Sequence, residues 1–328
     1  MMEAKTKGPE IVKESPEHLL PLADLEALIS SLHVDFVNLT ECVVSKGWRL
    51  SFSATDRPGI HYNLTGHGQV RIGRKSPVPI APHTLIIVPP RQSFAIEAAG
   101  SSGNVGKTAV RKWEANDASG TLQRAVAGCG RPHLLMICGY FEAGYGGAVD
   151  VFGSLQSPLI RTFDDRSELH HNLKGALKEL HAQEVGMSTM ASAMLKQVLV
   201  MLFRQSLKSS ELAENVFPLL RDARIAHAIA AMVAEPAAEH TVELLAQKCG
   251  LSRSGFMARF SESVGDTPMV VLRRLRLRKA AELLRVKTMS VEQVAKVTGY
   301  RSRNGFSKAF RKAYGFDPVK FRGATSST

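Results

Sequence analysis

Two groups of side chains near the C-terminal end of the chain have the chemistry to read nucleic-acid bases. The later group is made of neighbouring polar residues: Arg303, Asn304, Ser307 and Lys308. The earlier group occupies the matching positions, 50 residues before: Arg253, Ser254, Met257 and Ala258. Arginine and lysine pair with O6 and N7 of guanine, asparagine pairs with N6 and N7 of adenine, and apolar side chains contact the thymine methyl group. All eight residues are therefore candidates for base readout, and the later group is better equipped for hydrogen bonding.

The elements that would position these residues are encoded twice. Between Thr241–Gly250 and Ser290–Gly299 a hydroxyl residue, Val, Glu, Ala and Gly recur at an offset of 49. Beyond the glycine the offset is 50, and it holds through six further pairs: Ser252/Ser302, Gly255/Gly305, Phe256/Phe306, Phe260/Phe310, Gly265/Gly315 and Pro268/Pro318. Two copies are too few for a solenoid. They indicate a duplicated supersecondary unit.

Each copy predicts a helix, a glycine-containing turn and a second helix. Thr241 and Ser290 are N-cap residue types, and Gln293 fits a capping box with Ser290. The glycine after each first helix suits a left-handed C-cap, which has a low energetic cost only without a Cβ. Ser252 and Ser302 then begin second helices whose phenylalanines, at i and i+4, share one buried face. This is the helix-turn-helix plan, in which the second helix enters the DNA major groove.

Between the copies, residues 268–286 predict one long helix with Pro268 at its first position. Its basic residues are expected to face outward, some of them toward phosphates: Arg273, Arg274, Arg276, Arg278 and Lys279. A stiff helix of this kind would hold two recognition helices about 34 Å apart, one turn of DNA. Five arginines in and around these elements are candidates for phosphate contacts, which position a protein without reading sequence: Arg259, Arg273, Arg274, Arg301 and Arg311.

Charge points to the same partner. The chain has 42 Lys and Arg against 30 Asp and Glu, a net charge of +12. From residue 221 to 328 there are 20 basic and 9 acidic residues, whereas the remainder is close to neutral. A solvated basic face would account for such an excess by itself. Its coincidence with the duplicated helix-turn-helix favours double-stranded DNA as the partner.

The C-terminal stretch resembles the DNA-binding domain of the AraC/XylS family of bacterial transcription regulators. The resemblance is carried by Leu245, Ala246, Gly250, Phe256, Phe260, Gly265 and Pro268, and by Val294, Ala295, Gly299, Tyr300, Phe306, Phe310, Gly315, Pro318, Phe321 and Arg322. It implies a sequence-specific transcription regulator, with an activator's contact to RNA polymerase.

The first part of the chain has the texture of a β domain behind a short helix at residues 22–32. Short apolar runs separated by Gly, Pro and Asp predict strands of an antiparallel sandwich or small barrel: Val34–Leu39, Trp48–Ser53, Ile60–Leu64, Gln69–Ile72, Thr84–Val88 and His133–Cys138. Residues 98–130 are rich in Gly, Ala, Ser and Lys, and we interpret them as a mobile insertion. A helical pair is predicted over residues 166–208. The apolar face of its second helix is interpreted as core, with the alternative that part of it also buries a dimer partner.

This part is similar to the cupin-like regulatory domain of one branch of the same family, through His61–Gly66, Leu85–Arg91 and Leu135–Phe141. The resemblance implies a barrel that binds a small effector, dimerises, or both. A cupin enzyme gathers two or three histidines and a carboxylate around a metal. Here His61, His67 and His83 are scattered, without a His-x-His pair. We therefore expect no metal, no cofactor and no enzymatic activity.

The predicted organisation is a two-domain α+β chain. A flexible N-terminus (1–20) precedes a cupin-like antiparallel β-barrel with a helical dimerisation segment (21–210), a linker (211–220) and an all-α domain with two helix-turn-helix motifs (221–323). With no apolar run of membrane-spanning length, no signal-peptide pattern and four unclustered cysteines, we expect a cytoplasmic homodimer. The alternatives are a barrel that only dimerises and, less favoured, a cupin metalloenzyme.

Overall fold

The computed structural model describes residues 20–98, 107–111, 123–153, 155–164, 170–171, 174–175, 185–206, 222–286 and 288–324. Several predicted segments lie wholly or mostly outside these residues. They are the flexible N-terminus, the linker at 211–220 and most of the first helix of the predicted pair.

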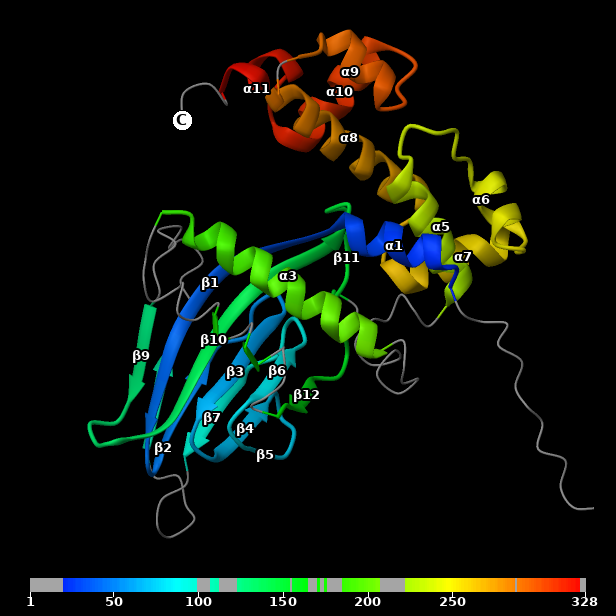
Figure 1. Ribbon diagram of the computed structural model, residues 1–328. Coiled ribbons are helices and arrows are strands. Elements are labelled where there is room, and N and C mark those ends of the chain that lie inside the picture. The colour runs from blue at the N-terminus through cyan, green and yellow to red at the C-terminus, as the bar shows by residue number, and fades with distance from the viewer. Residues whose placement is uncertain are drawn as a thin grey trace, which may run out of the picture.

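The N-terminal domain is built on two sheets that face each other (Figure 1). The strands are β1 (Leu32–Ser45), β2 (Trp48–Phe52), β3 (Gly59–Thr65), β4 (Gly68–Ile72), β5 (Val78–Ile80), β6 (Thr84–Val88), β7 (Phe94–Ala98), β8 (Lys107–Arg111), β9 (Gln123–Ala127), β10 (Pro132–Tyr145), β11 (Val149–Asp150) and β12 (Leu159–Thr162). One sheet has the order β12-β6-β3-β10-β1-β9, with β11 beside β10, and the other has the order β5-β4-β7-β2-β8. The buried residues between the sheets form an apolar interior.

The two sheets confirm the cupin-like β fold, but they are not wholly antiparallel. Strand β8 pairs with β2 and strand β9 pairs with β1, both in parallel. These two strands lie within residues 98–130, so the interpretation of that whole stretch as a mobile insertion is wrong for residues 107–111 and 123–127. The composition of this stretch predicted a loop, but composition is a poor guide to short strands because strand propensity depends strongly on context. Here β8 and β9 each pair with the edge of a sheet, where backbone N–H and C=O groups would otherwise be unpaired.

Helices cover one face of the larger sheet and make up most of the described residues from 222 onward. They are α1 (Leu22–Ser31), α3 (Met187–Ser206), α5 (Ala223–Ala234), α6 (Val242–Lys248), α7 (Arg253–Val264), α8 (Pro268–Val286), α9 (Val291–Val297), α10 (Arg303–Tyr314) and α11 (Pro318–Ala324). Helix α3 lies across the strands of the larger sheet, α1 lies beside α5, and α8 leads away to α9, α10 and α11 (Figure 1). Among the described helices, none has the length and apolarity to span a bilayer.

Helix α3 shows why its apolar face was ambiguous from sequence. Ala191, Leu195, Val198, Leu199 and Leu202 are buried in the cluster that includes the outer face of the larger sheet. Most of the apolar face of α3 is therefore buried in the protein's own core.

Candidate nucleic-acid interface

The first helix-turn-helix motif is formed by α6 and α7. The Thr241 hydroxyl accepts a hydrogen bond from the Leu244 backbone N–H at 3.1 Å, and the Ser252 hydroxyl accepts one from Gly255 N–H at 3.2 Å. Gly250, which follows α6, has a φ of 62°, so the turn needs a residue without a Cβ. Phe256 and Phe260 are fully buried. Both N-caps and the buried face agree with the sequence prediction.

The second motif repeats this construction in α9 and α10. Ser290 and Gln293 form a complete capping box, with Gln293 N–H donating to Ser290 Oγ at 3.1 Å and Ser290 N–H donating to Gln293 Oε1 at 2.7 Å. Ser302 caps α10 through Gly305 N–H at 3.2 Å. Phe306 and Phe310 are fully buried. The predicted capping box and the predicted buried face are therefore both present.

The eight candidate base-reading residues lie at the N-terminal ends and outward faces of α7 and α10. Six are exposed: Arg253, Ser254, Ala258, Arg303, Asn304 and Lys308. Met257 and Ser307 are half-buried beside the phenylalanines of their helices. Each recognition helix therefore presents a polar end to solvent while its opposite face is held in the core.

The two arginines at matching positions differ in their surroundings. Arg253 Nε forms an ion pair of 2.8 Å with Glu243 Oε1, and both side chains are more than half exposed. A pair this exposed is weak and easily exchanged for another partner. Among the described residues, no ion pair is recorded for Arg303. Arg303, in the second motif, is thus the guanidinium that does not have to leave such an ion pair.

The candidate phosphate-contacting arginines do not share one environment. Arg273 and Arg301 are exposed, and Arg311 lies 3.8 Å from Asp317. Arg259 Nη1 donates to Asp222 Oδ2 at 3.0 Å. Burial pushes the pKa of Asp222 upward, but hydrogen bonds from Arg259 and the Arg224 N–H, with the charges of both arginines, outweigh it and leave the pKa below its usual range. Arg259 thus also fastens α7 to the start of α5.

Arg274 is placed differently from the rest. Its guanidinium forms an ion pair with Asp266 in a cleft between the N-terminal domain and α8. Arg274 therefore faces this cleft, and we do not assign it to the DNA-facing residues of α7 and α10.

Arg276 corrects the expectation that all the basic residues of α8 face outward. Its Nε donates to the Pro236 carbonyl at 2.8 Å and its Nη2 to the Ala238 carbonyl at 3.0 Å. Burial accordingly lowers its pKa. Sequence spacing missed this because the two carbonyls belong to the turn after α5, which only the tertiary structure brings to α8. Arg276 is a structural clamp between α8 and that turn.

The histidines that a cupin metal site would need do not come together. His61 is fully buried between the sheets with its ring centroid 3.7 Å from that of Phe94, and burial lowers its pKa to about 3, so it is neutral. His67 is exposed, and His83 lies on the other side of β3 near Tyr62. Over the described ranges, no group of three or more His, Cys, Asp or Glu has a geometry that could hold a metal ion.

Comparison with known proteins gives two family matches. Residues 245–324 match a model described as "Helix-turn-helix domain", and residues 24–208 match one described as "Cupin". The HTH-type transcriptional regulator MtrA of Neisseria gonorrhoeae is 24% identical over 309 residues. The match covers 92% of this chain and 96% of the MtrA chain.

Other relatives match in part. An uncharacterised HTH-type transcriptional regulator of Haemophilus influenzae is 27% identical over 61% of this chain and 66% of its own. The RCS-specific HTH-type transcriptional activator RclR of Escherichia coli is 31% identical over 42% of this chain, and the match spans about half (48%) of its length. Among solved structures, the DNA-binding domain of AdpA in complex with a target DNA is 31% identical, covers 31% of this chain and 91% of its own, and has a TM-score of 0.30.

Proposed function

The chain belongs to the AraC/XylS family of DNA-binding transcription regulators and carries an N-terminal cupin domain, and from that premise we propose how it reads DNA. Helices α7 and α10 enter successive major grooves on one side of the duplex, and α8 holds them in register. The N-terminal domain controls this binding through a small effector, through dimerisation, or through both.

One observation carries the proposal. Two capped helix-turn-helix units, each with a fully buried phenylalanine pair, present polar N-terminal ends of their second helices to solvent. A helix fixed from behind by its apolar face can place its N-terminal side chains against base edges without large ordering costs. This arrangement, present twice, supports bipartite recognition.

The base-reading roles follow from side-chain chemistry. We assign guanine recognition to Arg303 and Lys308, adenine recognition to Asn304, and a supporting hydrogen bond to Ser307. In the first motif, Arg253 and Ser254 supply hydrogen bonds, and Met257 and Ala258 contact thymine methyl groups. The exposed arginines Arg273, Arg301 and Arg311, with Arg259 after it leaves Asp222, contact phosphates.

The remaining assignments concern the whole protein. We propose that it acts in the cytoplasm as a homodimeric activator that contacts RNA polymerase, as its family resemblance implies. The cupin match over residues 24–208 supports an effector-binding or dimerising role for the N-terminal domain.

Genome-wide DNA capture followed by footprinting on the strongest site tests the proposal. We expect two protected major-groove segments about 10 bp apart on one face of the duplex. Alanine at Arg303 should weaken specific binding by about 1–3 kcal/mol at one base position, whereas alanine at Arg301 should weaken all sequences alike. One protected segment, or equal losses for both variants on specific and random DNA, would contradict the division of roles.

Thermal unfolding separates the two roles proposed for the N-terminal domain. A ligand that binds the native state at 100 times its dissociation constant stabilises it by about 2.7 kcal/mol. A small-molecule library that raises the melting temperature supports an effector site. A chain-concentration dependence of the melting temperature without any ligand response supports a domain that only dimerises.

A further inference from the structure

The first motif is joined to the N-terminal domain by a continuous apolar core. Leu28 of α1, Ile229 of α5, Phe256 of α7 and Leu275 of α8 belong to one buried cluster that also holds the outer face of the larger sheet. Beside it, Asp24 Oδ2 and His227 Nδ1 lie 2.5 Å apart and join α1 to α5. Burial of these apolar side chains makes the α1–α5 contact the more stable of the two contacts between the N-terminal domain and the first motif.

A second contact lies on the other side of the junction, where the turn between β10 and β11 meets α8. Gly146 N–H donates to the Ser31 carbonyl at 2.9 Å, and Gly146 and Gly147 have φ values of 54° and 61°. A Cβ at Gly146 would collide with Leu275, and one at Gly147 with the Arg278 guanidinium. Arg278 Nη1 reaches the Gly147 carbonyl at 3.5 Å. The close fit against Leu275 therefore requires glycine at residue 146, while the positive φ of Gly147 favours glycine beside the movable guanidinium of Arg278.

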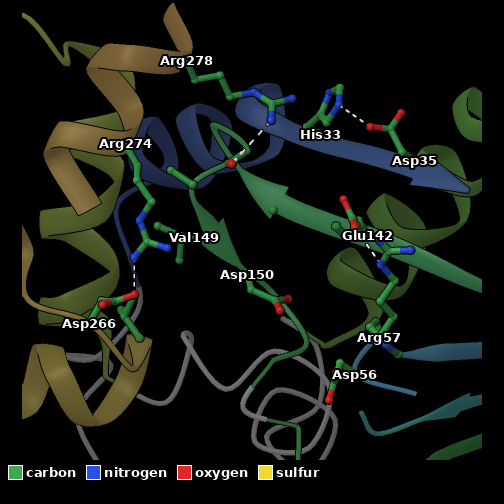
Figure 2. Close-up of a pocket in the computed structure, with 16 residues that line it drawn as sticks. His33, Asp35, Asp56, Arg57, Glu142, Val149, Asp150, Asp266, Arg274 and Arg278 are labelled. Carbon is green, nitrogen blue, oxygen red and sulfur yellow. Dashed lines mark hydrogen bonds and ion pairs between the residues drawn. The ribbon is translucent and has the colours of Figure 1, made fainter. Parts of the chain in front are cut away.

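An open cleft of about 480 Å³ separates this turn from the rest of α8. Figure 2 shows Arg274 and Arg278 extending from α8 into it, opposite side chains that come from the ends of the barrel strands. The barrel side supplies four carboxylates: Asp35, Asp56, Glu142 and Asp150. Burial, with a contribution from the charge of Glu142, raises the pKa of Asp150. On the barrel side Arg57 pairs with Glu142 at 2.8 Å and His33 with Asp35 at 2.7 Å, and on the α8 side Asp266 pairs with Arg274. Carboxylates still outnumber guanidinium groups on the barrel side, whereas the α8 side carries Arg274 and Arg278 against Asp266.

We propose that the cleft face of α8, with Arg274 and Arg278, is the surface through which the N-terminal domain holds and moves the DNA-binding domain, and is not a phosphate-contacting surface. A phosphate brought to these arginines would enter a site already lined by carboxylates and would be repelled. This inference rests on the proposed function, because it concerns regulation of the same pair of reading helices.

The device works because the two sides of the junction differ. The α1–α5 side is apolar and acts as a hinge, whereas the cleft side is polar, open to solvent and held by few hydrogen bonds, so it is the side that opens. Leu275 joins α8 to the first core, and Ala280, Ala281 and Leu284 join the same helix to the second. A displacement of the β10–β11 turn against α8 therefore reaches both motifs through one rigid helix.

Hydrogen exchange and DNA binding, measured on the full chain, test the inference. The variants are Arg274→Ala and Arg278→Ala, with Arg273→Ala as the matched control. Arg273 is the neighbouring exposed arginine, and it is not among the residues that line the cleft. Circular dichroism checks that each variant is folded.

We expect Arg278→Ala to speed amide exchange of residues 144–149 by about three- to tenfold, because it loses the hydrogen bond to the Gly147 carbonyl. Arg274→Ala should change this exchange less, because the ion pair of Arg274 is with Asp266 in the α7–α8 turn. The affinity of both variants for a random duplex should stay within about twofold of the parent chain. Arg273→Ala should leave exchange unchanged and lower the slope of log affinity against log salt by about one.

The inference is overturned if Arg274→Ala and Arg278→Ala weaken random-duplex binding as Arg273→Ala does, or if Arg278→Ala does not change the exchange of residues 144–149. A parent chain that binds no duplex would contradict the proposed function instead. The exchange comparison needs no DNA, so the two failures are distinguishable.

Discussion

The two helix-turn-helix motifs are close copies in sequence but differ in what surrounds them. Phe256 and Phe260 belong to a core that reaches through α5 and α1 into the N-terminal domain. Phe306 and Phe310 belong to a separate cluster formed by α8 to α11. The first motif thus shares its apolar core with the N-terminal domain, whereas the second motif has a separate apolar core.

The difference extends to the reading surfaces. In the second motif the outward residues of α10 are strong hydrogen-bonders, and the motif carries a complete capping box. In the first motif, Arg253 is paired with Glu243, and Arg259 is paired with Asp222. Duplication therefore supplied two similar frames, of which the first is packed against the N-terminal domain and the second has its own core and the more polar outward face.

Truncating a core phenylalanine in each motif is the largest test of this comparison. Phe256→Ala and Phe306→Ala should each cost about 3–5 kcal/mol, because both side chains are fully buried. What unfolds should differ: Phe256→Ala should destabilise the N-terminal domain as well, whereas Phe306→Ala should leave it intact. Urea unfolding followed by exchange mass spectrometry of β10 and α3 measures this. Equal protection of the N-terminal strands in both variants would break the comparison.

Removing the matching arginines is the intermediate test. Arg303→Ala should cost about 1–3 kcal/mol in specific binding, as expected for a bidentate base contact. Arg253→Ala should cost less in binding free energy. In the parent chain, Arg253 must give up its ion pair with Glu243 in order to contact DNA, and this loss offsets part of the gain. Binding titrations against single-base variants of the footprinted site give both values. A larger loss for Arg253→Ala would reverse the assignment of the stronger reader.

Acidification gives the smallest effect and concerns the first motif alone. The folded-state pKa of Asp222 lies below its unfolded value, so this carboxylate stabilises the fold above about pH 4 and loses that contribution as pH falls through the folded pKa. Because Arg259 is about half exposed, with 48% of its side chain accessible, we expect under ~1 kcal/mol. Parent and Asp222→Asn should differ in melting temperature at pH 6, and the difference should shrink as the pH falls below about 4. A constant difference would exclude the carboxylate's charge as the cause.

Much of the C-terminal domain was predictable because its signals are local. N-caps at Thr241, Ser252, Ser290 and Ser302 and the i, i+4 phenylalanines involve residues within one turn of each other. The N-terminal domain was less so. Strands β5, β7, β11 and β12 were not predicted, and β8 and β9 lie in a stretch interpreted as a loop. Strands β5 and β11 have only three and two residues, too few for a periodic pattern. The other four strands, β7, β8, β9 and β12, are stabilised by partners distant in the chain.

The sequence by itself determined the duplicated helix-turn-helix, its caps, its buried face and its basic charge, since each depends on periodicity and residue chemistry over a few residues. The tertiary structure decided which arginines are free. Arg276 is bound to carbonyls at residues 236 and 238, Arg278 reaches Gly147, and Arg274 lies in an acidic cleft. A helix carries charges at every turn, but whether a charge meets solvent, backbone or a carboxylate depends on what packs beside it, and that neighbour is set by the fold.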